Sequence, residues 1–154
     1  MKTIFIAITI ILSLFLGIQA FAAGTCVKTI AERDEYNGIV VKKIACTADS
    51  GNGSFPATTV QLDGFVLRIE TDPGETAPQA GWDIVLNSAL SGADILLDAG
   101  ANRSATASEA TDITTHGAAY VGSVSMAISG NNVNSALIDV YIFIVTSKPV
   151  WMYQ

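Results

Sequence analysis

After residue 22, apolar and polar residues alternate with a period of two in short runs, and turn-forming residues separate these runs. A period of two is typical of β-strands with one buried face, whereas a helix repeats every 3.6 residues. The alternation predicts strands at residues 26–32, 38–48, 57–71, 82–88, 94–98, 119–129 and 136–145. We therefore expect an all-β fold without a helix in this part of the chain.

The Asp63-Gly64 dipeptide stands between two alternating runs, which is a strong short-range signal for a two-residue hairpin turn. Such a turn would place Leu62 opposite Phe65 and gather the apolar side chains on one face. The alternative is one long strand with a bulge at Gly64. With the hairpin, the chain has about eight strands and predicts a single antiparallel β-sandwich, immunoglobulin-like or jelly-roll-like. A small barrel is the alternative architecture.

A loop with two prolines follows the strand predicted at 57–71. Pro73 fixes φ at the first central position of a turn and Gly74 accepts a positive φ at the next, so Asp72-Pro73-Gly74 predicts a type II turn. Pro78 stiffens the return toward Trp82. We interpret this segment as a stiff connection whose exposed surface contacts a partner.

The first 22 residues have the pattern of a secretory signal peptide. Lys2 precedes the uncharged apolar stretch 4–18, and Ala20-Phe21-Ala22 matches a cleavage site. An uncleaved membrane anchor is the alternative, because the stretch without charged residues continues to Val27. We expect a signal peptide at 1–22 and a β-sandwich domain at 23–154, in a protein that is secreted, periplasmic or held at the cell surface.

Charge and the two cysteines fit an exported domain. Without Lys2, seven Lys and Arg residues face 14 Asp and Glu residues, so nucleic acid and, after signal cleavage, an anionic membrane surface are not expected partners. Cys26 and Cys46 are the two cysteines, and an even pair in an exported protein predicts a disulfide. Two buried free thiols are the alternative.

Candidate chemistry is sparse. His116 is the one histidine and lies in a polar loop, and no serine has the Gly-x-Ser-x-Gly context of a nucleophile. No spacing selects a catalytic pair among the carboxylates, and the loop at 49–54 does not match the EF-hand calcium pattern. We therefore expect no catalytic residue, no metal ion and no cofactor.

Three aromatic residues, Trp82, Trp151 and Tyr153, are candidates for contact with a partner. Trp82 alternates with Ile84 and Leu86, which places it in or at the edge of the core. Trp151 and Tyr153 lie in an apolar tail, where exposed aromatic side chains suit contact with a partner.

The block from Gly64 to Ser104 reads GFVLRIETDPG, then AP, WDIVL, GADIL and ANRS. It resembles small structural proteins from the morphogenesis regions of tailed phages and prophages, whose strands end in a similar Asp-Pro-Gly turn. The resemblance implies a β fold and a structural role, includes Arg103 in its last segment, and names no catalytic residue. The signal peptide and the cysteine pair distinguish this chain from virion proteins, which normally carry no signal peptide. Incorporation into a virion is what the resemblance alone would imply.

These observations favour a non-enzymatic structural or interaction module that engages a protein assembly or assembles with itself, with a surface glycan as a further candidate partner. A fimbrial or adhesin subunit is the alternative. Against strand donation, only about three residues precede Cys26 after the predicted cleavage site. A secreted carboxylate-dependent hydrolase has no positive support.

Overall fold

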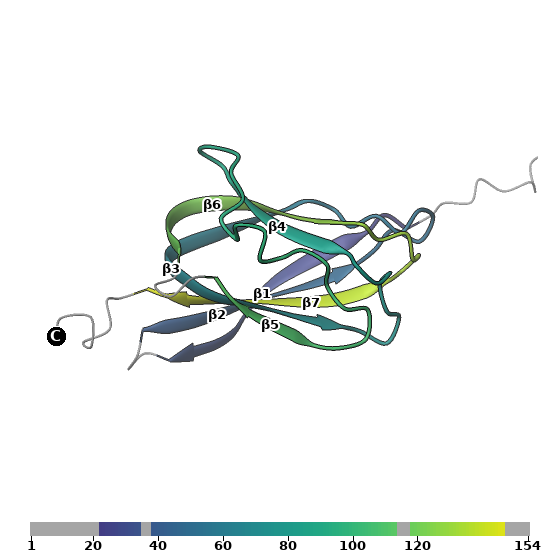
Figure 1. Cartoon of the computed structure of the whole chain (residues 1–154), viewed down its shortest axis with the longest axis horizontal. Coiled ribbons are helices and arrows are strands. Elements are labelled where there is room, and N and C mark those ends of the chain that lie inside the picture. The colour runs from purple at the N-terminus through teal and green to yellow at the C-terminus, as the bar shows by residue number, and fades with distance from the viewer. Residues whose placement is uncertain (1–21, 35–37, 114–117, 147–154) are drawn as a thin grey trace, which may run out of the picture.

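A computed structural model describes residues 22–34, 38–113 and 118–146 (Figure 1). The signal segment up to residue 21, His116, Trp151 and Tyr153 lie outside the described residues. Within the described part, no helix is long and apolar enough to cross a membrane. The described secondary structure is all β, and the strands are β1 Thr25–Asp34, β2 Ile39–Thr47, β3 Thr58–Pro73, β4 Asp83–Ser88, β5 Glu109–Asp112, β6 Ala118–Ser129 and β7 Leu137–Val145.

All strand pairs are antiparallel and form one continuous sheet in the order β1-β2-β7-β3-β6-β4, with β5 beside β3. The sheet folds into two layers because β3 belongs to both. Its residues 58–66 pair with β6, and its residues 65–73 pair with β7. The five-stranded layer is β1, β2, β7, the second half of β3 and β5, and the three-stranded layer is the first half of β3, β6 and β4. Figure 1 shows β4 and β6 on one side and β2, β7 and β5 on the other.

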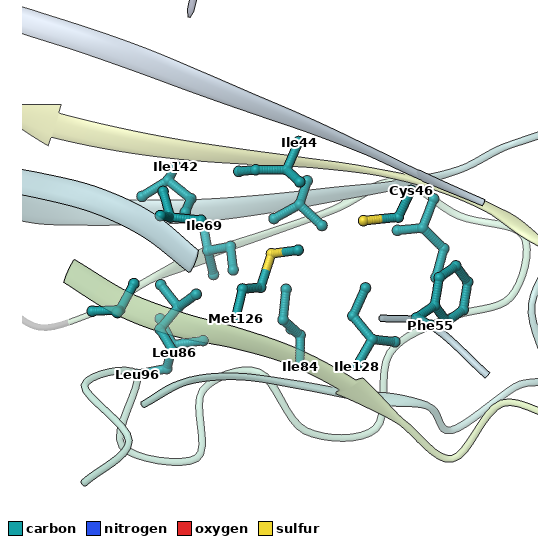
Figure 2. Close-up of a cluster of buried hydrophobic side chains, with 14 of the residues drawn as sticks. Ile44, Cys46, Phe55, Ile69, Ile84, Leu86, Leu96, Met126, Ile128 and Ile142 are labelled. Carbon is teal, nitrogen blue, oxygen red and sulfur yellow. The ribbon is translucent and has the colours of Figure 1, made fainter. Parts of the chain in front are cut away.

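The core fills the space between the two layers. It forms because alternate residues of each strand point inward, as the period of two predicted. Figure 2 shows side chains from both layers meeting in this space. The largest fully buried side chains are Trp82, Ile44, Leu62, Ile69, Ile84, Leu86, Leu96, Met126, Ile138, Ile142, Ile144 and Val60. The predicted antiparallel β-sandwich is thus confirmed, and Trp82 is a core residue.

The hairpin predicted at Asp63-Gly64 is wrong, and the alternative of one long strand is correct, although its bulge lies after Val66 rather than at Gly64. β3 runs without a break for 16 residues, and its register shifts between Val66 and Arg68. Gly64 has a φ of 139°, and a Cβ atom there would lie 2.1 Å from the carbonyl oxygen of Val145. Glycine therefore lets β3 pass close to β7 where it changes layers. In this protein the Asp-Gly pair serves this close approach and not a turn.

The strand predicted at 94–98 is also wrong, since residues 95–98 form turns and Asp94 makes only an isolated β-bridge to Asn87. The carboxylate of Asp94 accepts hydrogen bonds from the backbone N–H groups of Leu86, Leu96 and Asp98, at 3.0, 3.0 and 3.3 Å. Leu97 and Asp98 have positive φ values of 52° and 66°, which a strand does not allow. A strand that was not predicted, β5, lies instead in the long loop expected at 99–117.

The predicted disulfide between Cys26 and Cys46 is present. The two residues are opposite each other on β1 and β2, and Cys46 is 2% exposed. β1 is an edge strand whose side chains are almost all exposed, so the disulfide anchors it to the buried face of β2.

Candidate functional site

The outer faces of the two layers differ in chemistry. On the three-stranded layer, the outward positions of β6 are small, with Ser123, Ser125, Ala127 and Ser129. On the five-stranded layer, the outward positions of β7 and β3 carry large aromatic and charged side chains, which are Asp139, Tyr141, Phe143, Arg68, Glu70 and Asp72. Large amphipathic side chains are typical of binding surfaces, whereas small hydroxyl side chains offer little area for contact.

The five-stranded layer is hollowed where β3, β5 and β7 meet. This cleft has a volume of about 350 Å³ and is lined by Glu70, Thr71, Asp72, Ser108, Glu109, Ala110 and Tyr141. The strand register explains the gathering, because Glu70 lies opposite Tyr141 on β7 and opposite Ala110 on β5. We name it the β3–β5 cleft.

Arg103 lies next to Glu109, which lines the β3–β5 cleft. Its side chain is 4% exposed, its Nη2 donates to the carbonyl of Ala99 at 2.5 Å, and its Nη1 lies 4.0 Å from Oε2 of Glu109. The same carboxylate oxygen accepts the backbone N–H of Ser104 at 2.7 Å. Burial lowers the pKa of Arg103, and the charge of Glu109 opposes this shift. Arg103 was a candidate interaction-loop residue from the sequence, but its side chain is buried and offers little surface for a partner.

Arg68 organises the middle of the same outer face. Its Nε donates to Oδ1 of Asp112 at 2.8 Å, and its Nη1 lies 3.4 Å from Oε1 of Glu70. The hydrogen bond from Arg68 lowers the pKa of the Asp112 carboxyl. Beyond Arg68 lies a second hollow of about 200 Å³, lined by Ile39, Leu67, Arg68, Asp112 and Phe143.

Tyr141 is fixed from the other side by Lys43. The Lys43 ammonium lies 2.5 Å from Oδ2 of Asp139 and 5.4 Å from the centre of the Tyr141 ring. A cation at this distance from a tyrosine ring is attracted to it. The hydrogen bond to Asp139 raises the pKa of Lys43, so the ammonium stays charged at neutral pH. Tyr141 is therefore a half-exposed and positioned aromatic side chain at the cleft.

The Asp72-Pro73-Gly74 segment is not the type II turn predicted from the sequence. Pro73 ends β3, and Gly74 does not have the positive φ that this turn requires. The N–H of Gly74 donates to the carbonyl of Leu137 at 2.8 Å, and a Cβ on Gly74 would lie 2.5 Å from the Cβ of Leu137. Close approach to the start of β7 is the reason for glycine here.

Of the loop residues proposed as contacts, the structure places Asp72 in the lining of the β3–β5 cleft. Asp72 is exposed and accepts the hydroxyl of Ser108 at 2.5 Å. Arg103 does not line the cleft and approaches only Glu109, at 4.0 Å. Gly74 is exposed and Pro73 half-buried, while Pro78 is buried and offers no contact surface.

Sequence reasoning missed Tyr141 and Glu109, which define the cleft. Tyr141 lies in the strand predicted at 136–145, where every residue except Asp139 is apolar or aromatic, so no outward face stood out. The alternation of Asp139, Tyr141 and Phe143 was the available signal, since the intervening residues are all buried. Glu109 lay in a segment without periodicity, so nothing local indicated its strand.

No metal centre is found in the described ranges, where no three His, Cys, Asp or Glu side chains are grouped to hold an ion. The loop at 49–54, considered for calcium, is a capped turn. Oδ1 of Asp49 accepts the N–H groups of Gly51 and Asn52 at 2.7 and 3.0 Å. These two hydrogen bonds explain why an aspartate stands at the start of this turn, and no bound ion is needed to explain it.

Comparison with known proteins adds little to this geometry. No family model and no curated protein sequence matches the chain. Among solved structures, the N-terminal cellulose-binding domain of β-1,4-glucanase C from Cellulomonas fimi is similar, with a TM-score of 0.32 and 10% sequence identity. The alignment covers 82% of this chain and 90% of that one. Because this TM-score is low, we base nothing about a ligand on the similarity.

Proposed function

We propose that this protein is an exported, non-catalytic interaction module whose binding surface is the outer face of the five-stranded layer. The observation that carries the proposal is the contrast between the two outer faces. One has the β3–β5 cleft and the positioned aromatic side chain of Tyr141, and the other has mainly small side chains along β6.

The bonding of the carboxylates on this face supports a binding role over catalysis. Glu70 pairs with Arg68, Asp72 accepts a hydroxyl, and Glu109 accepts a backbone N–H. General acid–base chemistry needs a titratable group placed to exchange a proton with substrate. Side chains tied to one another in this way instead form a fixed polar surface around an aromatic centre, as a recognition site does.

We propose a protein assembly as the partner, of the kind built by the tailed-phage structural proteins that residues 64–104 resemble. The support is that Asp72, which belongs to this block, lines the β3–β5 cleft, and that Arg103, near the end of the block, lies 4.0 Å from the cleft residue Glu109. Tyrosine is also among the residues that most often dominate protein–protein binding energy. A surface glycan is the competing ligand, since carboxylates and hydroxyls around an aromatic ring also suit sugar hydroxyl groups.

A reciprocal pair of substitutions tests the proposed binding face. Tyr141→Ser removes the aromatic side chain from the cleft, and Ser125→Tyr adds one to the opposite face. The probe is co-sedimentation of the purified protein with envelope and particle fractions of the producing cells. We expect wild type and Ser125→Tyr to bind alike, and Tyr141→Ser to bind at least about tenfold more weakly, which corresponds to about 1.4 kcal/mol.

Protease treatment of the fractions then identifies the partner class. Loss of binding after treatment supports a protein partner, whereas binding that survives would replace it with a glycan. Equal binding by Tyr141→Ser and wild type, with both folded by circular dichroism, would reject the proposed face. Failure of every fraction to bind any variant would reject the interaction module itself.

A further inference from the structure

Three cationic side chains gather on the open side of the sandwich, between β1 of one layer and the first half of β3 in the other. Lys28, Arg33 and Lys42 line two adjoining hollows of about 310 and 260 Å³, and Lys42 belongs to both. The register places them on the inner face of the five-stranded layer, because Lys28 lies opposite the buried Ile44 and Arg33 opposite the buried Val40. We name the two hollows together the cationic groove.

The charge of this groove contrasts with the rest of the molecule. The described ranges hold six Lys and Arg residues, and the other three, Lys43, Arg68 and Arg103, each lie within 4.0 Å of a carboxylate oxygen. In the same ranges, none of the three groove cations forms an ion pair. Asp63 also lines the groove and accepts the side-chain amide of Gln61 at 3.3 Å. A chain with a formal net charge of −6 thus gathers these cations in one place, which favours an anionic ligand.

The opposite wall of the groove is an open strand edge. Residues 58–63 of β3 pair with β6 on one side, and no described strand pairs with them on the other. The carbonyl of Thr59 accepts the ammonium of Lys28 at 2.9 Å, and the carbonyl of Gln61 accepts that of Lys42. In a strand the N–H and C=O of one residue point to the same side, so the N–H groups of Thr59 and Gln61 also face the groove. Such an edge can pair with a further strand.

We propose that the cationic groove binds an extended acidic segment of another protein, which pairs with residues 58–63 as an added strand. The carbonyls of Thr59 and Gln61 are about 7 Å apart along β3, so the ammonium groups that they bind have the spacing of side chains at alternate positions of a strand. Acidic residues at every second position of the segment would face Lys28 and Lys42. The flexible lysine stems let both ammonium groups leave the carbonyls and bind these carboxylates.

Other occupants fit the groove less well. An anionic polysaccharide matches the charge, but its hydroxyl groups do not repeat with the spacing of the N–H and C=O groups of a strand edge. A second copy of this chain, paired edge to edge, would bring two sets of cations together. The site lies on the inner side of β1 and β2, so the inference is independent of the outer face proposed above.

NMR titration of the purified protein with synthetic peptides tests the proposal. The probe is a short peptide in which glutamate alternates with threonine, and the control peptide has glutamine in place of each glutamate. We expect the glutamate peptide to slow the amide exchange of Thr59 and Gln61 at least about tenfold, while the amides of Val60 and Leu62, which face β6, report that the fold is intact. The glutamine peptide should bind at least about fivefold more weakly, since it cannot form the ion pairs.

Two double variants locate the site on the protein. Lys28→Met with Lys42→Met removes both charges, keeps most of the stems, and should weaken binding of the glutamate peptide at least about fivefold. Gln79→Glu with Ala101→Glu is the matched control, because it changes the net charge equally at exposed positions outside the groove and should bind like wild type. Equal weakening in both double variants would overturn the proposal, since overall charge would then explain it. If the methionine variant fails to fold, the two peptides on wild type still decide.

The remaining outcomes identify a different occupant. Slow exchange of Thr59 and Gln61 before any peptide is added overturns the proposal, with a second copy on the edge if light scattering shows a dimer and the chain itself if it shows a monomer. Binding of polygalacturonate in place of the glutamate peptide overturns it in favour of a polysaccharide. Equal binding of the two peptides also overturns it. So does no binding of either, and Lys28 and Lys42 would then only shield the edge from aggregation.

Discussion

Replacing Gly64 by alanine perturbs the point where β3 passes from one layer to the other. Gly64 has a φ of 139°, and an added Cβ would lie 2.1 Å from the carbonyl oxygen of Val145 and 2.9 Å from its carbonyl carbon. Both atoms belong to the backbone of β7, which pairs with β2 on its other side. A clash with a central strand cannot be relieved by turning one side chain, so β3 and β7 must separate locally.

The expected magnitude follows from two contributions. Forcing extra atoms into a packed site costs about 1–3 kcal/mol, and a positive φ for a residue with a Cβ costs about 1–2 kcal/mol. Gly64→Ala should thus lower the free energy of unfolding by about 2–5 kcal/mol, out of the 5–15 kcal/mol typical of a domain. Gly92→Ala is the matched control, because Gly92 has a φ of 72° but no atom within 4 Å of an added Cβ. It should cost about 1 kcal/mol.

Urea denaturation followed by far-ultraviolet circular dichroism measures both variants. With equal slopes, the midpoints of Gly64→Ala and Gly92→Ala give the difference in free energy of unfolding directly. Equal losses in the two variants would refute the reasoning. In that case β3 would not pass so close to Val145, and a hairpin turn at Asp63-Gly64 would regain support.

Three further predictions concern stability. Replacing Cys26 and Cys46 together by serine should lower the free energy of unfolding by about 3 kcal/mol, because their separation of 20 residues closes a loop of that size; unchanged midpoints of urea denaturation would contradict this. Trp82→Phe should cost about 2 kcal/mol by thermal denaturation, since it removes the 3.0 Å indole hydrogen bond to the carbonyl of the loop into β5 and leaves a cavity. Arg68 holds the folded-state pKa of Asp112 below its ordinary 3.8, so the stability from this pair is present above that pH and is lost as the pH falls through the lower folded value. Asp112→Asn should flatten that part of the acid titration, and a dependence unchanged at low salt would contradict the assignment.

The strands with strict alternation were predictable because each buries one face and exposes the other. β2, β4, β6 and β7 were found within a few residues of their bounds, and the pairing of Cys26 with Cys46 followed from the count and compartment alone. β5 was not predictable, because its four residues take their place from pairing with residues of β3 that are 38 or more positions earlier in the chain.

Local signals failed where a distant contact determined the conformation. Asp-Gly at 63–64 resembled the turn of a hairpin. Glycine is required there because the carbonyl of Val145, 81 residues later in the chain, lies too close for a Cβ atom. Gly74 is likewise explained by Leu137. The β3–β5 cleft could be predicted only through Asp72, since the strands that bring Tyr141 and Glu109 beside it are joined by sheet topology rather than by neighbouring sequence.

The position of β7 has a consequence for the order of folding during synthesis. β7 comprises residues 137–145, yet it lies between β2 and the second half of β3. A chain that emerges with its N-terminus first therefore exposes β2 and β3 as unpartnered edges until β7 arrives. The five-stranded layer can close only after residue 145 has been delivered. Until then one edge each of β2 and of the second half of β3 is open, which is when the chain is most exposed to aggregation.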